Sequence, residues 1–423
     1  MRNATRIVVK ELKILLLQAI LFVFAMFQGG FVSWFLFYSM LPIVIYMMII
    51  PVYPLRNWQI ERDLSARYLQ AGSSVEVRIT IKRTFRFPIF CLVIEEEFPD
   101  VLRYQDMGKK KFQYLAKGLS YAKNRTVKKV LYPGFRKEFT LTYQLDHLPR
   151  GKHQLSDLKL RLEDPFGFVA GEHHVRCAQE FYVFPVMQEL KWKQQTISLE
   201  DGTNASVIHD ERVTNVVSSV REYVPGDRFS WIDWKTSARK NTMMTKEFEQ
   251  EKYANIVVIL QMEEQVEQKQ LIFEAAIEWT ASLIHSLRKK DQSISFYTLG
   301  GTEVIFSHQQ LQFQFPAVRN YLATIEQEQG ASLKERMAKP INELSRGSML
   351  LFVIYDLDKE LVDRLVDWQK REYTLTVCYI IPEKQLDSVQ QKYIQTLRLQ
   401  HVQVQVITEQ VLLEEQWEVR VSP

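Results

Sequence analysis

A stretch of 42 residues between Lys13 and Arg56 contains no Asp, Glu, Lys or Arg, and no other feature constrains the fold as strongly. As helix, such a stretch is about 63 Å long, enough to cross a hydrocarbon core of about 30 Å twice. Gln28, Gly29 and Gly30 form a turn signal within it. The sequence therefore predicts two transmembrane helices, at residues 14–27 and 31–52, joined as a tight hairpin.

The charges around this hairpin predict its orientation. Basic residues flank both of its ends, while its three-residue tip has none: Arg2, Arg6, Lys10, Lys13, Arg56, Arg62 and Arg67. The positive-inside rule therefore predicts that both termini and the soluble domains are cytoplasmic. A cleaved signal peptide is the alternative, but no small-residue cleavage site precedes the second apolar run.

The soluble part changes its periodicity about half-way. Apolar residues alternate with polar ones in residues 57–190, as at Val75, Val77, Ile79 and Ile81. This pattern is typical of half-buried antiparallel strands and predicts an immunoglobulin-like β-sandwich with no strong helix. Three scattered cysteines, Cys91, Cys177 and Cys378, give neither a disulfide framework nor a zinc pattern.

Residues 253–423 instead alternate short apolar runs with amphipathic stretches, which predicts a doubly wound, mostly parallel sheet. The predicted strands are 256–260, 294–299, 349–355, 374–381 and a final strand at 402–407, and the predicted helices are 272–287, 317–326, 333–344 and 361–368. The fold class is thus a multi-domain α+β protein: a hairpin at 1–56, a sandwich at 57–190, a linker at 191–252 and an α/β domain at 253–423.

The linker carries the most unusual segment, REYVPGD at 221–227 followed by WIDWKTSAR at 231–239. Pro225 and Gly226 suit the centre of a type II turn. Trp231 and Trp234 would share one face of a helical turn, and Asp233 would pair with Arg239.

This segment resembles the signature of a widespread bacterial family, domain of unknown function 58, which reads roughly R-x-Y-x-x-G-D-x-x-R-x-I-D-W-x-x-S-A-R. The chain departs from it at the middle arginine, where Ser230 stands. LPRG at 148–151, DPFG at 164–167 and FP at 184–185 also look like upstream motifs of the family. The matching residues are Arg221, Tyr223, Gly226, Asp227, Ile232, Asp233, Trp234, Ser237, Ala238 and Arg239.

The resemblance implies a protein anchored in the bacterial plasma membrane, with a β-domain and a von Willebrand factor A-like domain. It also implies a MoxR-type AAA+ ATPase as partner, with a membrane transglutaminase-like protein as a possible second one. Von Willebrand A domains often bind a divalent metal through Asp-x-Ser-x-Ser after the first strand. Only Gln261 and Glu263 stand there, with Asp356 as a weak further candidate, so we expect no metal or cofactor.

Two interpretations of the signature segment remain open. One is an interdomain clasp with buried indoles and the other is a docking surface or ligand site, and the two can coexist. The residues concerned are Arg221, Tyr223, Gly226, Asp227, Asp233, Trp234, Ser237 and Arg239.

Elsewhere the chain lacks the familiar hydrolase, zinc-protease, P-loop and dinucleotide-binding motifs. The formal charge of +4 hides a basic segment at 101–152 with a net charge of +10. We interpret this segment as a basic β-hairpin that could lie on anionic lipid headgroups; no nucleic-acid-binding pattern accompanies it. Its thirteen basic residues are Arg103, Lys109, Lys110, Lys111, Lys117, Lys123, Arg125, Lys128, Lys129, Arg136, Lys137, Arg150 and Lys152.

The sequence thus favours a membrane-anchored, non-enzymatic adaptor or chaperone-like accessory protein that works with a MoxR-type AAA+ ATPase in envelope-associated processes. One alternative is a hydrolase or transferase of envelope precursors that uses Asp227 and Asp233. A second is a metal-dependent adhesion or binding module.

Overall fold

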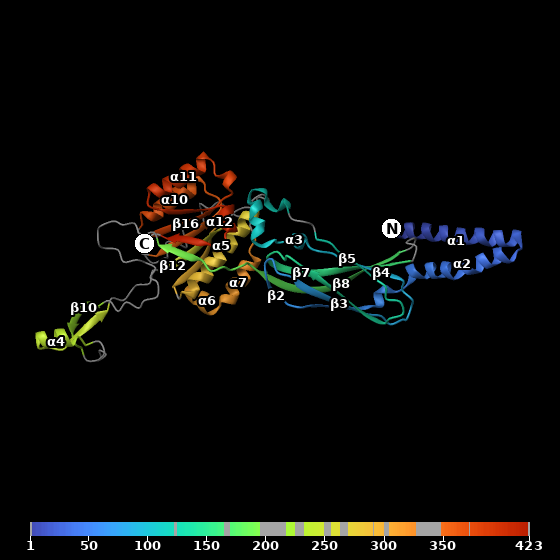
Figure 1. Cartoon of the computed structure of the whole chain (residues 1–423), viewed down its shortest axis with the longest axis horizontal. Coiled ribbons are helices and arrows are strands. Elements are labelled where there is room, and N and C mark those ends of the chain that lie inside the picture. Colours follow the sequence, from blue (N-terminus) through green and yellow to red (C-terminus); the bar gives the residue numbers. More distant parts are fainter. Residues whose placement is uncertain are drawn as a thin grey trace. The chain divides into compact units, whose positions relative to one another are not determined.

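The computed structural model describes residues 2–121, 125–164, 170–194, 217–224, 232–248, 255–262, 270–290, 292–299, 304–326, 348–371 and 373–421. The chain forms two compact units (Figure 1). Unit 1 comprises Met1–Val186 with Pro316–Glu326, and unit 2 comprises Met187–Phe315 with Gln327–Pro423.

Unit 1 begins with the predicted helical hairpin, formed by α1 (Arg2–Gln28) and α2 (Phe31–Ile49), which run side by side in Figure 1. Gly29 makes the turn with a φ of +59°, a conformation that favours glycine. Phe22 of α1 packs against Trp34 and Phe37 of α2, with ring centroids 6.4 and 5.5 Å apart. Among the described residues, Phe31–Val52 is long and apolar enough to cross a membrane, whereas Leu12–Gln28 is shorter.

The end of α2 continues directly into the core of the soluble part. Two short 3-10 helices follow it, η1 (Ile50–Val52) and η2 (Leu55–Asn57). Ile50, Leu55 and Trp58 are buried in the same apolar cluster as the strands. Gly171 allows strand β8 to approach η1, because a Cβ there would lie 3.2 Å from the carbonyl oxygen of Ile50.

Two sheets enclose this core. Buried side chains alternate with more exposed ones along β3, where Val75, Val77, Ile79 and Ile81 are all buried, as predicted. The sheets share one apolar cluster and therefore form a two-layer sandwich. The first sheet has the order β1-β3-β6, with β1 Gln59–Leu64, β3 Val75–Lys82 and β6 Glu138–Leu145; the second has the order β2-β8-β7-β4-β5, with β2 Tyr68–Gln70, β8 Ala170–Phe184, β7 Gly151–Glu163, β4 Cys91–Glu96 and β5 Val127–Leu131.

Two short helical segments accompany the strands of this half. A short α3 (Asp100–Arg103) and a 3-10 segment, η3 (Gly108–Tyr121), lie between β4 and β5. Phe112 and Leu115, three residues apart, are fully buried, and this spacing matches one 3-10 turn. The basic β-hairpin predicted for 101–152 is wrong, because η3 occupies part of this segment and β5 and β6 lie in different sheets.

Helix α7 (Phe315–Thr324) also belongs to unit 1. Nη1 of Arg150, from the LPRG motif, donates to the carbonyl oxygens of Leu322, Ala323 and Ile325 at 2.7, 3.1 and 2.9 Å. A guanidinium at this position satisfies terminal carbonyls and complements the helix dipole. The LPRG motif thus fixes α7 to the sandwich.

Unit 2 contains a six-stranded sheet of order β14-β13-β12-β15-β16-β17, parallel except for β14. Helices α10 and α11 cover one face, and α5 contacts β12, β13, β15 and β16 (Figure 1). The strands are β12 Ile256–Gln261, β13 Ile294–Leu299, β14 Ile305–Phe306, β15 Met349–Ile354, β16 Thr374–Ile380 and β17 Gln403–Ile407; the helices are α5 Gln270–Lys289, α6 His308–Phe313, α10 Lys359–Gln369, η6 Glu383–Gln385, α11 Ser388–Leu399 and α12 Glu409–Leu413.

The strand at 402–407 is not the final one, contrary to the prediction. After β17 the chain adds α12 and then β18 (Glu418–Val421), which pairs in parallel with β9 (Lys191–Gln194). Trp417, just before β18, is fully buried and stacks on Trp279 of α5 with ring centroids 5.0 Å apart. The helix predicted at 333–344 lies outside the described residues.

A buried ionic cluster crosses the sandwich. Nη2 of Arg62 lies 2.6 Å from Oε1 of Glu96, and both side chains are at most 1% exposed. The hydroxyl of Tyr143 donates to the other carboxylate oxygen of Glu96. Burial raises the pKa of Glu96, while the neighbouring guanidinium opposes that shift. This buried ion pair therefore links the two sheets.

We expect Arg62→Ala to lower the unfolding free energy of the sandwich by about 3–5 kcal/mol, because it leaves Glu96 buried without its cation. The matched control is Arg78→Ala, whose pair with Glu76 is 60% and 51% exposed; it should cost less than about 1 kcal/mol. Denaturant unfolding of the detergent-solubilised chain measures both variants. Equal costs would contradict the structural role assigned to the buried pair.

Candidate functional site

The described part of the signature segment folds as a two-stranded ribbon with a short helix. Strands β10 (Val217–Glu222) and β11 (Met244–Phe248) are antiparallel, and α4 (Trp234–Lys240) precedes β11. Ile232 bridges to Thr245, and the amide of Asp233 donates to the carbonyl oxygen of Met244 at 2.9 Å. Ile232 and Met244 are buried, so the ribbon has a small apolar centre.

Asp233 and Ser237 fix α4 to this ribbon. One carboxylate oxygen of Asp233 accepts from the amides of Lys235 and Thr236, both at 3.1 Å, and so caps the helix. These bonds, led by the amide of Thr236, lower the pKa of Asp233. The Ser237 hydroxyl donates to the Asp233 carbonyl oxygen at 2.7 Å and accepts from the Met244 amide at 2.9 Å.

The predicted pairing of Asp233 with Arg239 is not seen among the described residues. The Asp233 carboxylate faces the first amides of α4, whereas Arg239 lies in the last turn of that helix. A carboxylate at the N-terminus and a guanidinium at the C-terminus each complement the helix dipole. The two charges therefore act at opposite ends of α4.

The side chain of Trp234 is 64% exposed, unlike the buried indole of the clasp interpretation. Trp234 is the first residue of α4, a helix that buries none of its residues. Two other apolar residues at this end of the ribbon are exposed, Val224 at 54% and Met243 at 47%. The Tyr223 amide donates to the Met243 carbonyl oxygen at 2.8 Å, which keeps the two strands together here.

Arg221, the last but one residue of β10, is exposed, and its Nη1 donates to the neighbouring carbonyl oxygen of Glu222 at 3.1 Å. Gly226, Asp227 and Trp231 lie outside the described residues. The structure therefore brings together Tyr223, Asp233, Trp234 and Ser237 of the predicted set.

At the end of β12, Gln261 has a structural role that the sequence did not reveal. Its Oε1 accepts from the amides of Tyr355 and Asp356, at 2.9 and 3.1 Å, and its Nε2 donates to the Asp356 carbonyl oxygen at 3.0 Å. The amide oxygen that a cation could have used is thus engaged by two buried donors. Asp358, rather than Asp356, caps α10 by accepting from the Leu361 amide at 2.8 Å, and Glu263 lies outside the described residues.

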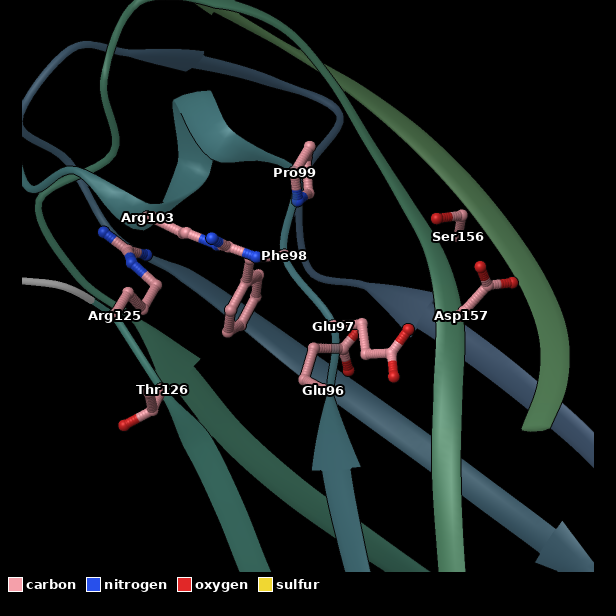
Figure 2. Close-up of a pocket in the computed structure, with 9 residues that line it drawn as sticks. All are labelled: Glu96, Glu97, Phe98, Pro99, Arg103, Arg125, Thr126, Ser156 and Asp157. Atoms are coloured by element: carbon pink, nitrogen blue, oxygen red, sulfur yellow. The ribbon is translucent and has the colours of Figure 1, made fainter. Parts of the chain in front are cut away.

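The sandwich also contains a cavity of about 560 Å³ that no sequence motif marks. Figure 2 shows Arg103 and Arg125 grouped near Phe98, while the carboxylates of Glu97 and Asp157 lie on the other side. A register shift in β7 between Leu155 and Asp157 forms part of this rim. Its described lining comprises Glu96, Glu97, Phe98, Pro99, Arg103, Arg125, Thr126, Ser156 and Asp157.

Part of the basic segment is internal. Nζ of Lys111 lies 2.6 Å from Oδ2 of Asp106, and both side chains are buried. Nη2 of Arg125 donates to the carbonyl oxygens of Asp146 and His147, and burial lowers the pKa of Arg125. With Arg150, three of the thirteen basic residues therefore stabilise the fold rather than charge the surface.

Comparison with known proteins identifies the family. A model described as protein of unknown function DUF58 matches residues 219–384. "Uncharacterized protein YeaD" of Bacillus subtilis (strain 168) is 32% identical over 308 residues, which cover 73% of this chain and 72% of that protein. The chain belongs to the DUF58 family.

Solved structures resemble this DUF58 protein only weakly. The match to the CARDB domain of the PF1109 protein from Pyrococcus furiosus covers 30% of this chain and 91% of that domain, with 11% identity and a TM-score of 0.18. The match to a cohesin module from a Clostridium perfringens family 33 glycoside hydrolase covers 30% of this chain and 98% of that module, with 10% identity and a TM-score of 0.20. Likenesses at this level establish no shared architecture.

We expect Asp233→Ala to fray α4, because the amides of Lys235 and Thr236 lose their acceptor, whereas Asp233→Asn should retain the cap. In the wild type, the depressed pKa means that the cap is at full strength above about pH 4, the ordinary Asp value, and weakens as pH falls through the folded pKa. Hydrogen-exchange protection of these amides, corrected for intrinsic rates, measures both effects. Protection that is unchanged in Asp233→Ala would refute the cap.

Proposed function

We propose that this DUF58 protein is a membrane-anchored, non-enzymatic adaptor that docks a cytosolic MoxR-type AAA+ ATPase through the exposed end of its signature ribbon. The main support is the exposure of Trp234, whose side chain is 64% exposed although its neighbours Asp233 and Ser237 form hydrogen bonds within the ribbon and α4. An exposed indole, on the same ribbon as the exposed Val224 and Met243, has the chemistry of a protein-binding anchor. The envelope client and a membrane transglutaminase-like protein would be recruited through the same assembly.

We assign the six-stranded sheet to a von Willebrand factor A-like domain. Numbered along the chain, its strands have the order 3-2-1-4-5-6, with the third, β14, antiparallel at the edge. This order supports a doubly wound domain whose site would lie at the carboxyl ends of the strands. Gln261 stands at that end, and its engagement with Tyr355 and Asp356 favours a protein-binding role over metal-dependent adhesion.

The anchor in this proposal is the α1–α2 hairpin, with Phe31–Val52 as the span that its length and hydropathy support. Both termini and the soluble units would lie on the cytoplasmic side of the bacterial plasma membrane, where an AAA+ ATPase has access. The immunoglobulin-like β-domain would then be the membrane-proximal part.

The rival hydrolase or transferase would need Asp233 as an acid or base. Its carboxylate instead accepts two helix amides and its pKa is lowered, so it is a poor proton donor at neutral pH. This geometry counts against an acid role for Asp233.

The test is binding of the purified full-length protein, in detergent or nanodiscs, to the MoxR-type ATPase of the same organism. If Trp234 is an anchor worth about 2 kcal/mol, Trp234→Ala should raise the Kd roughly 30-fold. Leu399→Ala is the matched control, since Leu399 is 78% exposed on α11 outside the ribbon and should leave the Kd unchanged.

Two outcomes would contradict the proposal at different levels. A folded Trp234→Ala variant that binds like the wild type would remove the ribbon as the docking site. Failure of the wild-type protein to bind the ATPase would remove the adaptor function itself.

A further inference from the structure

Two loops of the sandwich expose an unusual set of aromatic side chains. They are residues 83–90, between β3 and β4, and residues 132–137, between β5 and β6; we call them the aromatic loops. The rings of Phe90 and Tyr132 meet across the loops, with centroids 6.3 Å apart. The exposed aromatic residues are Phe85 at 60%, Phe90 at 54%, Tyr132 at 71% and Phe135 at 66%.

A buried arginine holds the two loops as one body. Arg83 is 4% exposed, and each of its guanidinium nitrogens donates to a loop carbonyl oxygen. Nε donates to the carbonyl oxygen of Arg136 at 2.6 Å, Nη1 to that of Phe87 at 2.6 Å and Nη2 to that of Gly134 at 2.7 Å. Because these three hydrogen bonds hold the backbone of both loops, the aromatic rings are presented in a fixed arrangement.

The same loops are attached to the end of α2. The Tyr46 hydroxyl donates to the Pro88 carbonyl oxygen at 2.9 Å and accepts from the Phe90 amide at 3.2 Å. The Phe87 ring stacks on Tyr46 and Tyr53, with centroid distances of 5.5 and 5.1 Å. The position of the loops along the helix axis is thus defined by Tyr46.

That position lies near the end of the apolar span. The 22 residues of Phe31–Val52 extend about 33 Å as helix, slightly more than a hydrocarbon core of about 30 Å, and Ile50 is already buried among the strands, so the edge of the core lies on the Tyr46 side of Ile50. Tyr46 precedes Val52 by about 9 Å of helix. On the neighbouring helix, Ile14 packs with Val44 and Met47, so the charged Lys13 stands at nearly the same level.

Basic side chains accompany the rings. Arg86, Arg136 and Lys137 are all exposed on the aromatic loops. Aromatic rings favour the boundary between headgroups and acyl chains, and neighbouring Lys and Arg side chains favour anionic lipid phosphates. The occupant that fits this surface is the bilayer that surrounds α2.

We propose that the aromatic loops insert Phe85, Phe90, Tyr132 and Phe135 into the headgroup–acyl boundary of a bilayer containing anionic lipid. The inference rests on the membrane anchoring in the proposed function, and it adds a second contact between the protein and the membrane. Together with α2, this contact fixes the tilt of the sandwich on the membrane surface.

The test uses the full-length protein in vesicles of phosphatidylcholine with a minority of phosphatidylglycerol. An environment-sensitive nitrobenzoxadiazole label is placed at Phe90→Cys or Phe135→Cys, after replacement of Cys91 and Cys177 by alanine; Cys378 is fully buried. Both labels should emit at the blue-shifted wavelength of an apolar site, and lipids with a spin label near the headgroup should quench them more than lipids labelled near the chain end.

Tyr68→Cys is the matched control. Tyr68 is 67% exposed and pairs with Tyr182, whereas η1 packs near Gly171 at the other end of β8, about 36 Å away along the strand. Its label should emit as in water and escape quenching by either lipid.

A label at Phe35→Cys in α2 separates the two claims. If its emission is blue-shifted as in hydrocarbon while the labels at Phe90 and Phe135 emit as in water, the proposed insertion of the aromatic loops is wrong but the membrane anchor remains supported. If the label at Phe35 also reports water, the anchoring fails and the inference fails with it.

Discussion

The join between α2 and the sandwich is the interaction on which the rest of unit 1 depends. Ile50 and Leu55 follow the apolar helix without a linker and are buried among the strands. Gly171 makes room for the Ile50 carbonyl, and Tyr46 bonds to the loop at Pro88. A flexible tether would let the domain tumble, but here separating helix from sandwich would expose core residues to water, which opposes it. The hairpin and the sandwich therefore form one compact unit.

Buried arginines organise this unit in a way that composition conceals. Arg83, Arg125 and Arg150 donate to backbone carbonyl oxygens of loops or a helix end, and Arg62 pairs with Glu96. Such groups lose their hydration, so each must keep its acceptors for the fold to be stable. Net charge by segment therefore overstates the surface charge.

Patterns that a single element determines could be predicted from the sequence. The hairpin follows from an uncharged run interrupted by Gly29, and β3 follows from strict alternation. Features that depend on distant partners could not be predicted: η3 buries Phe112 and Leu115, and β18 pairs with β9. The sequence left open whether Trp234 is buried or exposed, and the structure places it on α4, a helix that buries none of its residues.

The central claim is that α2 and the sandwich move as one body. Spin labels at Phe35→Cys and Tyr68→Cys, in the full-length protein in vesicles, test it through their distance distribution by double electron–electron resonance. A single narrow distribution is predicted, and Gly171→Val, which would push β8 away from the Ile50 carbonyl, should broaden it. A broad distribution in the protein without that substitution would show that the helix and the sandwich move independently, which would contradict the account.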